Sequence, residues 1–440
     1  MLMKIEIKEW ESLSEISREK LLLRSEQSIA EVEENVQEII ETVKRKGDRA
    51  VREYTLRFDK VDMGSKPLRV SEQEIEKSEE MLSNDIKESL RFSVENVRRF
   101  HQRQKQEGFD FVEIREGVFA GERITPITSA GLYVPRGRGS FPSMVYMLAV
   151  PAKIAGVPRI CMVTPPCEDG SVDPACLFAA RLCGVDEIYR VGGVQAIAAL
   201  AFGTESINPV VKVTGPGSVY VSAAKKLLYG VLDVGLPAGP SESVILADES
   251  ADPEKITLDL LIEAEHGSDS SALLITPSRE LAVKVAELIP DYIASLPEPR
   301  KTFVTDVFSG YGGIIKTRSM VSGAEVVNLF APEHLQIQTR DPFQTLSLIK
   351  NAGEILLGDR VPFSTANYSV GANAVLPTGG KARTCSAVSV RDFIKYSSLV
   401  YLTEEGYNTL KPHVIRMADY EGFVAHGNAL KLREKGDTLS

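Results

Sequence analysis

Apolar residues recur every three or four positions in the first hundred residues, as they do on one face of a helix. The first run occupies positions 29, 32, 36, 39, 40 and 43, and Gly47 follows it. This spacing predicts an amphipathic helix that ends near the glycine. Ser71 and Glu74 have the spacing of a capping box, which predicts a second helix start. A third stripe predicts a further helix with its apolar face at Ile86, Leu90, Val94 and Val97.

The pattern shifts towards strands from about residue 111. Apolar residues on both sides of Gly117, between residues 111 and 120, predict a β-hairpin. Strands are then expected at 131–135, 160–163, 187–191 and 210–214, and helices at 143–155, 174–182, 194–202 and 219–228. A second series of strands is expected at 244–247, 272–275, 335–338 and 354–357. This alternating order predicts an α/β fold with two successive doubly wound parallel units.

Composition narrows the classes of function. The 440 residues include 51 Lys and Arg against 61 Asp and Glu, a formal charge of −10 that disfavours nucleic acid and anionic membranes as partners. No apolar run approaches the length of a membrane span, and acidic residues interrupt the N-terminal apolar positions where a signal peptide would have none. The five cysteines form no C-x-x-C motif, so we expect free thiols in a reducing, cytoplasmic compartment.

Glycine-rich segments follow three expected strands. They are Gly137-Arg138-Gly139, Gly192-Gly193 and the segment 214–218, Thr-Gly-Pro-Gly-Ser. Each alone fits a tight turn as well as a nucleotide-binding loop. Because ligands bind at the carboxyl ends of the strands in open parallel sheets, three such turns together favour one shared ligand crevice.

Two of the five histidines stand close to carboxylates in the sequence, and a third, His426, lies five residues after Glu421. Glu263 and His266 are three residues apart on an expected helix, so both can reach one metal ion. Glu333 and His334 come directly before an expected strand, where an imidazole beside a carboxylate suits proton transfer. His426 lies between an apolar pair and a glycine. Each histidine also has an explanation without chemistry. Glu263 and His266 can be neighbours by chance, His334 can be a residue that ends a helix, and His426 can be a structural histidine.

Several segments spread over residues 36–432 match the pattern of one known enzyme family. They include Gly131-Leu-Tyr-Val-Pro135, the run 191–205 that begins Val-Gly-Gly-Val-Gln, and Leu236-Pro-Ala-Gly-Pro-Ser-Glu242. Shorter matches are Ala264-Glu-His-Gly267, Pro332-Glu-His-Leu335, Val375-Leu-Pro-Thr378 and Ala425-His426. By their number and common order, the chain resembles the histidinol dehydrogenase family, whose members are zinc- and NAD-dependent enzymes of histidine biosynthesis.

The resemblance implies a homodimer built on two incomplete Rossmann-like units, with C-terminal tails exchanged between subunits. On this basis we expect an N-terminal helical region and hairpin at 1–128 and an NAD-binding unit at 129–236. A second unit with metal and catalytic residues is expected at 237–380, and a tail that docks on the partner subunit at 381–440. Such a tail would account for the apolar character of residues 420–432.

The resemblance also implies roles for individual residues. Glu333 and His334 match the catalytic acid/base pair, and Tyr133, Gln195 and Ser218 match positions that contact NAD. The positions that match zinc ligands are Glu263, His266, Asn367 and His426. The positions that match substrate contacts are Ser241, Glu263, His266, His334, Asn367, Glu421 and His426. In the family, an alcohol is oxidised to an aldehyde and, after hydration, to an acid, with two NAD molecules reduced in succession.

The sequence departs from the family pattern inside this site. Glu263 stands where a glutamine is usual and Asn367 where an aspartate is usual, so the charge of the ligand set is unchanged and both oxygens remain acceptable to zinc. Ser218 replaces a usual asparagine, and Ala374 a usual histidine. Arg136 and Arg138 offer positive charge to an anionic substrate group, to cofactor phosphates or to solvent.

Three functions are compatible with these departures. The first is the oxidation of L-histidinol to L-histidine with a rearranged metal shell. The second is the oxidation of another small polar alcohol, such as a sulfopropanediol, by a paralogue with the same chemistry. The third is a non-catalytic metal-binding module, which the intact pair of Glu333 and His334 disfavours.

Overall fold

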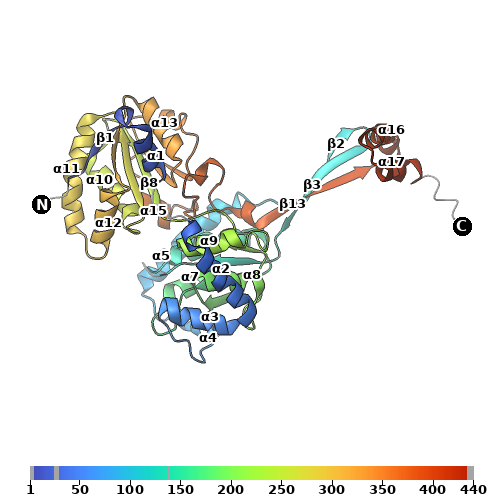
Figure 1. Cartoon of the computed structure of the whole chain (residues 1–440), viewed down its shortest axis with the longest axis horizontal. Coiled ribbons are helices and arrows are strands. Elements are labelled where there is room, and N and C mark those ends of the chain that lie inside the picture. Colours follow the sequence, from blue (N-terminus) through green and yellow to red (C-terminus); the bar gives the residue numbers. More distant parts are fainter. Residues whose placement is uncertain (1–3, 24–28, 137–138, 434–440) are drawn as a thin grey trace. The chain divides into compact units, whose positions relative to one another are not determined.

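The computed structural model describes residues 4–23, 29–136 and 139–433. Its contacts divide the chain into two units, Met1–Lys105 with Ile127–Phe393 and Gln106–Pro126 with Ile394–Ser440. The first unit contains two parallel sheets, and the second contains an antiparallel sheet (Figure 1). The fold is therefore mixed α/β with parallel sheets, as the sequence predicts.

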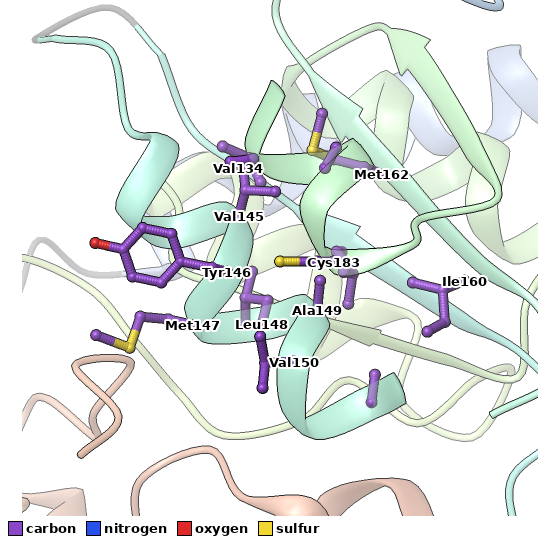
Figure 2. Packing of buried hydrophobic residues seen from close by; sticks show 14 of the residues in the cluster. Val134, Val145, Tyr146, Met147, Leu148, Ala149, Val150, Ile160, Met162 and Cys183 are labelled. Carbon is purple, nitrogen blue, oxygen red and sulfur yellow. The ribbon is translucent and has the colours of Figure 1, made fainter. Parts of the chain in front are cut away.

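The first parallel sheet has four strands in the order β6-β5-β4-β7. In chain order they are β4 (Ala130–Tyr133), β5 (Ile160–Thr164), β6 (Glu187–Arg190) and β7 (Lys212–Thr214). The intervening helices are α6 (Pro142–Ala155), α7 (Pro174–Cys183), α8 (Gly193–Phe202) and α9 (Val219–Leu227). All four predicted strands and helices are confirmed. The helix α6 is apolar along most of its length because it is buried against the sheet, as Figure 2 shows for Val145, Leu148 and Ala149.

N-terminal helices cover this half of the first unit. They are α2 (Ile29–Lys46), α3 (Asp48–Tyr54), a π-helical turn (Thr55–Asp59), α4 (Glu72–Ser78) and α5 (Asn84–Gln102). The helix α1 (Glu15–Leu23) packs instead against the second parallel sheet, through Leu21 and Leu22. The predicted capping box is confirmed, since Ser71 and Glu74 exchange hydrogen bonds at the start of α4. The stripe on α5 is confirmed at Leu90, Val94 and Val97, but Ile86 is 47% exposed, so its assignment to the buried face was wrong. The five cysteines are free thiols.

The second parallel sheet has six strands in the order β1-β10-β9-β8-β11-β12. The strands are β1 (Ile7–Glu9), β8 (Glu242–Ala247), β9 (Ser271–Thr276), β10 (Gly313–Lys316), β11 (His334–Gln338) and β12 (Glu354–Leu357). The pattern predicts β8, β9, β11 and β12, and misses β1 and β10. The helices are α10 (Pro253–Ala264), α11 (Arg279–Ser295), α12 (Arg300–Ser309), α13 (Met320–Phe330), α14 (Pro342–Leu346) and α15 (Phe363–Tyr368). Short 3-10 turns occupy Trp10–Ser12, Lys381–Arg383 and Val390–Phe393.

The second unit pairs the predicted hairpin with a strand from the C-terminal region. The hairpin is β2 (Val112–Arg115) and β3 (Val118–Pro126), and β13 (Ile394–Leu402) pairs antiparallel with β3. The helices α16 (Glu404–Glu421) and α17 (Val424–Lys431) follow. Large apolar side chains remain exposed on them, with Tyr420 at 89% and Val424 at 69%. Across the described ranges, no helix combines the length and hydrophobicity that a membrane crossing requires.

Candidate active site

The two parallel sheets carry the predicted site residues at opposite ends of their strands. In the first sheet, Tyr133 is the last residue of β4, Gly192-Gly193 follow β6, and the glycine-rich segment from Thr214 follows β7. These residues lie at the carboxyl edge, as expected for an open parallel sheet. In the second sheet, His334 is the first residue of β11, so the predicted acid/base pair lies at the amino edge.

One segment links these two edges. Tyr146, in the first turns of α6, donates a hydrogen bond to the carbonyl of Tyr368 at 2.7 Å. Asn373 donates to the carbonyl of Met147 in the same helix at 2.6 Å. Further along, the amide of Gly379 donates to Glu242, the first residue of β8, at 2.8 Å. Residues 368–379 thus connect the helix that follows the first sheet's carboxyl edge to the amino edge of the second sheet.

The predicted metal ligands of the first unit form one hydrogen-bonded group. Helix α10 returns the chain from the end of β8 to the start of β9, so its last turn brings Glu263 to the amino edge. Glu263 is fully buried, and its Oε1 accepts a 2.7 Å hydrogen bond from Asn367. Its Oε2 lies 3.3 Å from His266 Nδ1, which shares a 2.9 Å hydrogen bond with Ser241. Four residues named by the sequence therefore meet here.

This group has the donor chemistry of a zinc site. Glu263 Oε2 is buried without a hydrogen-bond partner, which is costly for a carboxylate oxygen unless a cation or donor joins it. Carboxylate oxygen and imidazole nitrogen are both ordinary zinc ligands. In the part of the chain that the structure describes, no group of three or more His, Cys, Asp and Glu side chains is arranged as a metal site. The first unit alone therefore offers an incomplete ligand set that fits zinc.

The acid/base pair lies beside the same carboxylate. His334 Nε2 is 4.0 Å from Glu263 Oε1 and 3.8 Å from Glu333 Oε1. Glu333 Oε2 accepts a 2.9 Å hydrogen bond from the backbone amide of Glu242. On its other side, His334 Nδ1 lies 3.0 Å from Oε2 of Glu354, a residue that the sequence did not single out. The register of β11 and β12 pairs these two residues, but register was not visible in the sequence.

Burial and charge shift the pKa values of this pair in ways that suit proton transfer. Burial raises the pKa of Glu333 to about 8, against the pull of the neighbouring His334. Burial alone would lower the pKa of His334, but the carboxylates of Glu263, Glu333 and Glu354 raise it to about 10. Burial would likewise raise the pKa of Glu263, yet His266, His334 and the Asn367 amide hold it below its usual value. Glu263 is thus the permanent anion, and Glu333 can gain or lose its proton near neutral pH.

The predicted cofactor residues lie at the carboxyl edge of the first sheet. Gln195, in the first turn of α8, is fully buried, and both its amide oxygen and its amide nitrogen lack hydrogen-bond partners. Tyr133 Oη accepts a 3.0 Å hydrogen bond from the amide of Gly193. Ser218 is the N-cap of α9, yet its side chain makes no capping hydrogen bond. Polar groups without partners at the carboxyl ends of these strands fit a polar cofactor.

The glycine-rich segment after β7 packs too tightly for a side chain. A Cβ on Gly215, whose φ is +122°, would lie 2.1 Å from the carbonyl oxygen of Tyr133. The carbonyl of Gly215 accepts a hydrogen bond from Lys225, a fully buried lysine whose pKa burial lowers to about 8. The backbone therefore lies directly against the residue predicted to contact the cofactor.

The structure adds one half-buried carboxylate, Asp59, to this edge. Asp59 Oδ2 is buried without a hydrogen-bond partner, and burial raises the pKa of Asp59 to about 6, against the effect of Arg136. Arg136 itself is exposed and donates to the carbonyl of Pro166 at 3.3 Å. Arg138 lies outside the described residues. Asp59 follows a helix in a charged stretch, so nothing in the sequence distinguished it from a solvated residue.

The remaining predicted residues lie elsewhere. Glu421, at the end of α16, and His426, in α17, belong to the second unit, and both are exposed. The ring of His426 packs 5.0 Å from that of Phe423. Ala374 is half-buried and packs against the core of the first sheet. His101, expected to need no chemical role, is fully buried and shares a 2.8 Å hydrogen bond with the carbonyl of Val97.

Comparisons with known proteins find similarity to the same family along nearly the whole chain. A sequence profile described as histidinol dehydrogenase matches residues 22–434. A Synechocystis protein named histidinol dehydrogenase is 50% identical over 415 residues, which cover 94% of this chain and 96% of that protein. A Colwellia psychrerythraea protein named histidinol dehydrogenase homolog is 45% identical and covers 97% and 96%. The crystal structure of histidinol dehydrogenase from Elizabethkingia anophelis superposes with a TM-score of 0.91 at 33% identity, covering 99% of this chain and 98% of that one.

Proposed function

Because the chain belongs to the histidinol dehydrogenase family, whose members are NAD-dependent oxidoreductases acting on CH–OH groups, we propose that it oxidises L-histidinol through the aldehyde to L-histidine. The observation that carries this proposal is the link between the two sheet edges. Residues 368–379 connect the helix that follows the edge with Tyr133 and Gln195 to the edge that holds Glu333 and His334. Cofactor and alcohol would then occupy neighbouring halves of one site.

Zinc fits the group around Glu263, with His266 and Asn367 as the other ligands from the same chain. When bound there, zinc supplies a Lewis-acidic anchor for the polar groups of the substrate. We propose that His426 of the partner subunit completes the ligand set and that Glu421 of the partner subunit contacts the substrate. Exposure of both residues on the second unit, together with the exposed apolar side chains of α16 and α17, supports such tail exchange in a homodimer.

The first oxidation needs a proton acceptor for the alcohol. In its neutral form, His334 would take the hydroxyl proton on Nε2, the nitrogen that faces Glu333 and Glu263, and NAD would accept the hydride. A cation bound at Glu263 would favour the neutral ring, because the Glu263 carboxylate is one of the charges that raise the pKa of His334. Gln195 and Tyr133 would hold the cofactor, and Ser241 would bind a polar group of the substrate.

The second oxidation needs an activated water. Glu333 would remove a proton from the water that adds to the aldehyde, since its pKa of about 8 allows it to act as a base near neutral pH. A second hydride then passes to a second NAD. In total, one alcohol, one water and two NAD molecules give one carboxylate, two NADH and three protons.

The residues of the site are also compatible with a substrate other than L-histidinol. The exchange of Glu263 with Asn367 moves the carboxylate to the other side of the proposed metal site without changing the ligand charge. A site built to pair polar groups rejects a mismatched substrate strongly. The alternative is therefore another small polar alcohol, such as a sulfopropanediol, oxidised by the same residues.

One assay separates these substrates. NADH formation is measured with L-histidinol and with a panel of diols and sulfonated or phosphorylated polyols, using protein purified without chelator and analysed for zinc. We expect zinc near one equivalent per chain and the highest kcat/KM with L-histidinol. A rate on L-histidinol no greater than on unrelated alcohols would exclude it as the substrate, and zinc-independent activity would exclude the metal.

A further inference from the structure

Glu354 is a buried carboxylate at the amino edge to which the proposed mechanism assigns no role. It is the first residue of β12 and stands opposite His334 in the register of the sheet. Its side chain is 7% exposed and that of His334 is 3% exposed. The 3.0 Å contact between Glu354 Oε2 and His334 Nδ1 is therefore shielded from water, which strengthens it.

The surroundings of His334 leave its ring little freedom. The amide of Glu354 donates to the carbonyl of Glu333 at 2.9 Å, and the amide of Gly353 donates to the carbonyl of Pro332 at 2.9 Å. The ring of Phe363 packs against the imidazole at 5.7 Å, with 68° between the planes. With Nδ1 directed at Glu354, Nε2 is directed at the carboxylates of Glu333 and Glu263.

We propose that Glu354 is the positioning residue for His334: its carboxylate accepts the Nδ1 proton and thereby leaves Nε2 as the nitrogen that takes the proton of the alcohol. This inference rests on the proposed function. In the reaction, the alcohol proton moves to Nε2, the Nδ1 proton stays in place, and Glu354 remains ionised beside the imidazolium. A carboxylate that fixes the tautomer and stabilises the charged ring is the usual partner of a histidine base.

The kinetic test uses the full-length enzyme with Glu354→Gln, which keeps the side-chain shape and removes the charge. We expect kcat to fall about 10- to 100-fold while KM for the alcohol and for NAD stays within about twofold. The matched control is Asp259→Asn. Asp259 is also buried and accepts hydrogen bonds from Gln336 and Gln338, whereas the hydrogen bond of His334 Nδ1 is with Glu354. We expect kcat of the control within about twofold of the parent.

A proton NMR measurement tests the same contact without substrate. The Nδ1 proton of His334 should give a strongly downfield signal, assigned by its loss in His334→Asn. It should move upfield in Glu354→Gln and stay in place in Asp259→Asn.

The outcomes separate the two proposals. A parent enzyme that fails to oxidise L-histidinol would overturn the proposed function, while the NMR signal would still report on the pair. Glu354→Gln with unchanged kcat, or with an unmoved His334 signal, would overturn the positioning role. A fall in kcat together with the shifted signal supports it.

Discussion

The two parallel sheets of the first unit use opposite ends of their strands. The four-stranded sheet presents Tyr133 and the glycine-rich turns at its carboxyl edge, where open parallel sheets ordinarily bind ligands. The six-stranded sheet presents Glu333 and His334 at its amino edge, at the start of β11, where the last turn of α10 also brings Glu263. Fold class alone would have placed the site of the six-stranded sheet at its carboxyl edge. The location of this site therefore has to be inferred from the chemistry of the individual residues.

The pKa values of carboxylates are also shifted in opposite directions near the two edges. Near the first sheet, Arg190 at the end of β6 donates to Glu74 at 2.7 Å, and this hydrogen bond lowers the pKa of Glu74 to about 2. At the amino edge of the second sheet, burial raises the pKa of Glu333 to about 8. The first arrangement fixes a charge for structure, and the second leaves a proton available for chemistry.

The largest expected effect is at the amino edge. His334→Asn should lower kcat about 10²- to 10⁴-fold, because it removes the base that takes the alcohol proton. Binding of NAD and zinc should remain, since neither depends on that imidazole. Steady-state kinetics, NAD titration and metal analysis check the three quantities. Turnover equal to that of the parent would remove His334 from the mechanism.

An exchange of two side chains tests the metal site at the same edge. Glu263→Gln alone removes the carboxylate and should lower zinc affinity at least about tenfold. The double variant Glu263→Gln with Asn367→Asp restores the charge on the opposite side and should recover most of that affinity. Competition with a chelator measures it. If the double variant binds zinc no better than the single one, these two residues do not share the metal.

A smaller effect is expected at the carboxyl edge. Gln195→Leu should raise KM for NAD about 2- to 10-fold with little change in kcat, because one hydrogen-bonded contact to the cofactor is lost. Thermal stability should not fall, since the buried amide has no partner in the protein. A lower kcat with an unchanged KM for NAD would place Gln195 with the chemistry instead.

The smallest effect concerns stability in acid. Because the folded state lowers the pKa of Glu74, its contribution to stability is present above pH 4.5 and is lost as the pH falls towards 2. Glu74→Gln should flatten this dependence, by no more than about 1 kcal/mol because the side chain is partly solvated. Urea unfolding between pH 2 and pH 6 measures the slope. An equally steep slope in the variant would assign the acid sensitivity to other carboxylates.

The sequence predicted most strands of the two parallel sheets but missed β1, β10 and β13. The strand β5, buried along its whole length, is a nearly continuous apolar run. In contrast, β1 contains Lys8 and Glu9, and β10 has only two large apolar residues between a glycine and a lysine. The strand β13 is exposed over most of its length, so it shows no buried alternation. Its pairing with β3 joins residues far apart in the chain.

The candidate site was predictable only where residues are close in sequence or match the family. Glu263 and His266 are three residues apart on a helix, and Glu333 and His334 are adjacent. Glu354 reaches His334 through strand register, which a single sequence does not reveal. Asp59 differs from solvated acids only by its burial.

The central claim is that cofactor and alcohol meet across the two opposite edges. A crystal structure of the full enzyme with zinc, NAD and L-histidinol tests it most directly. We predict the nicotinamide ring beside Tyr133 and Gln195, with the carbinol carbon between it and His334. A cofactor bound at the carboxyl edge of the six-stranded sheet, away from these residues, would contradict the account.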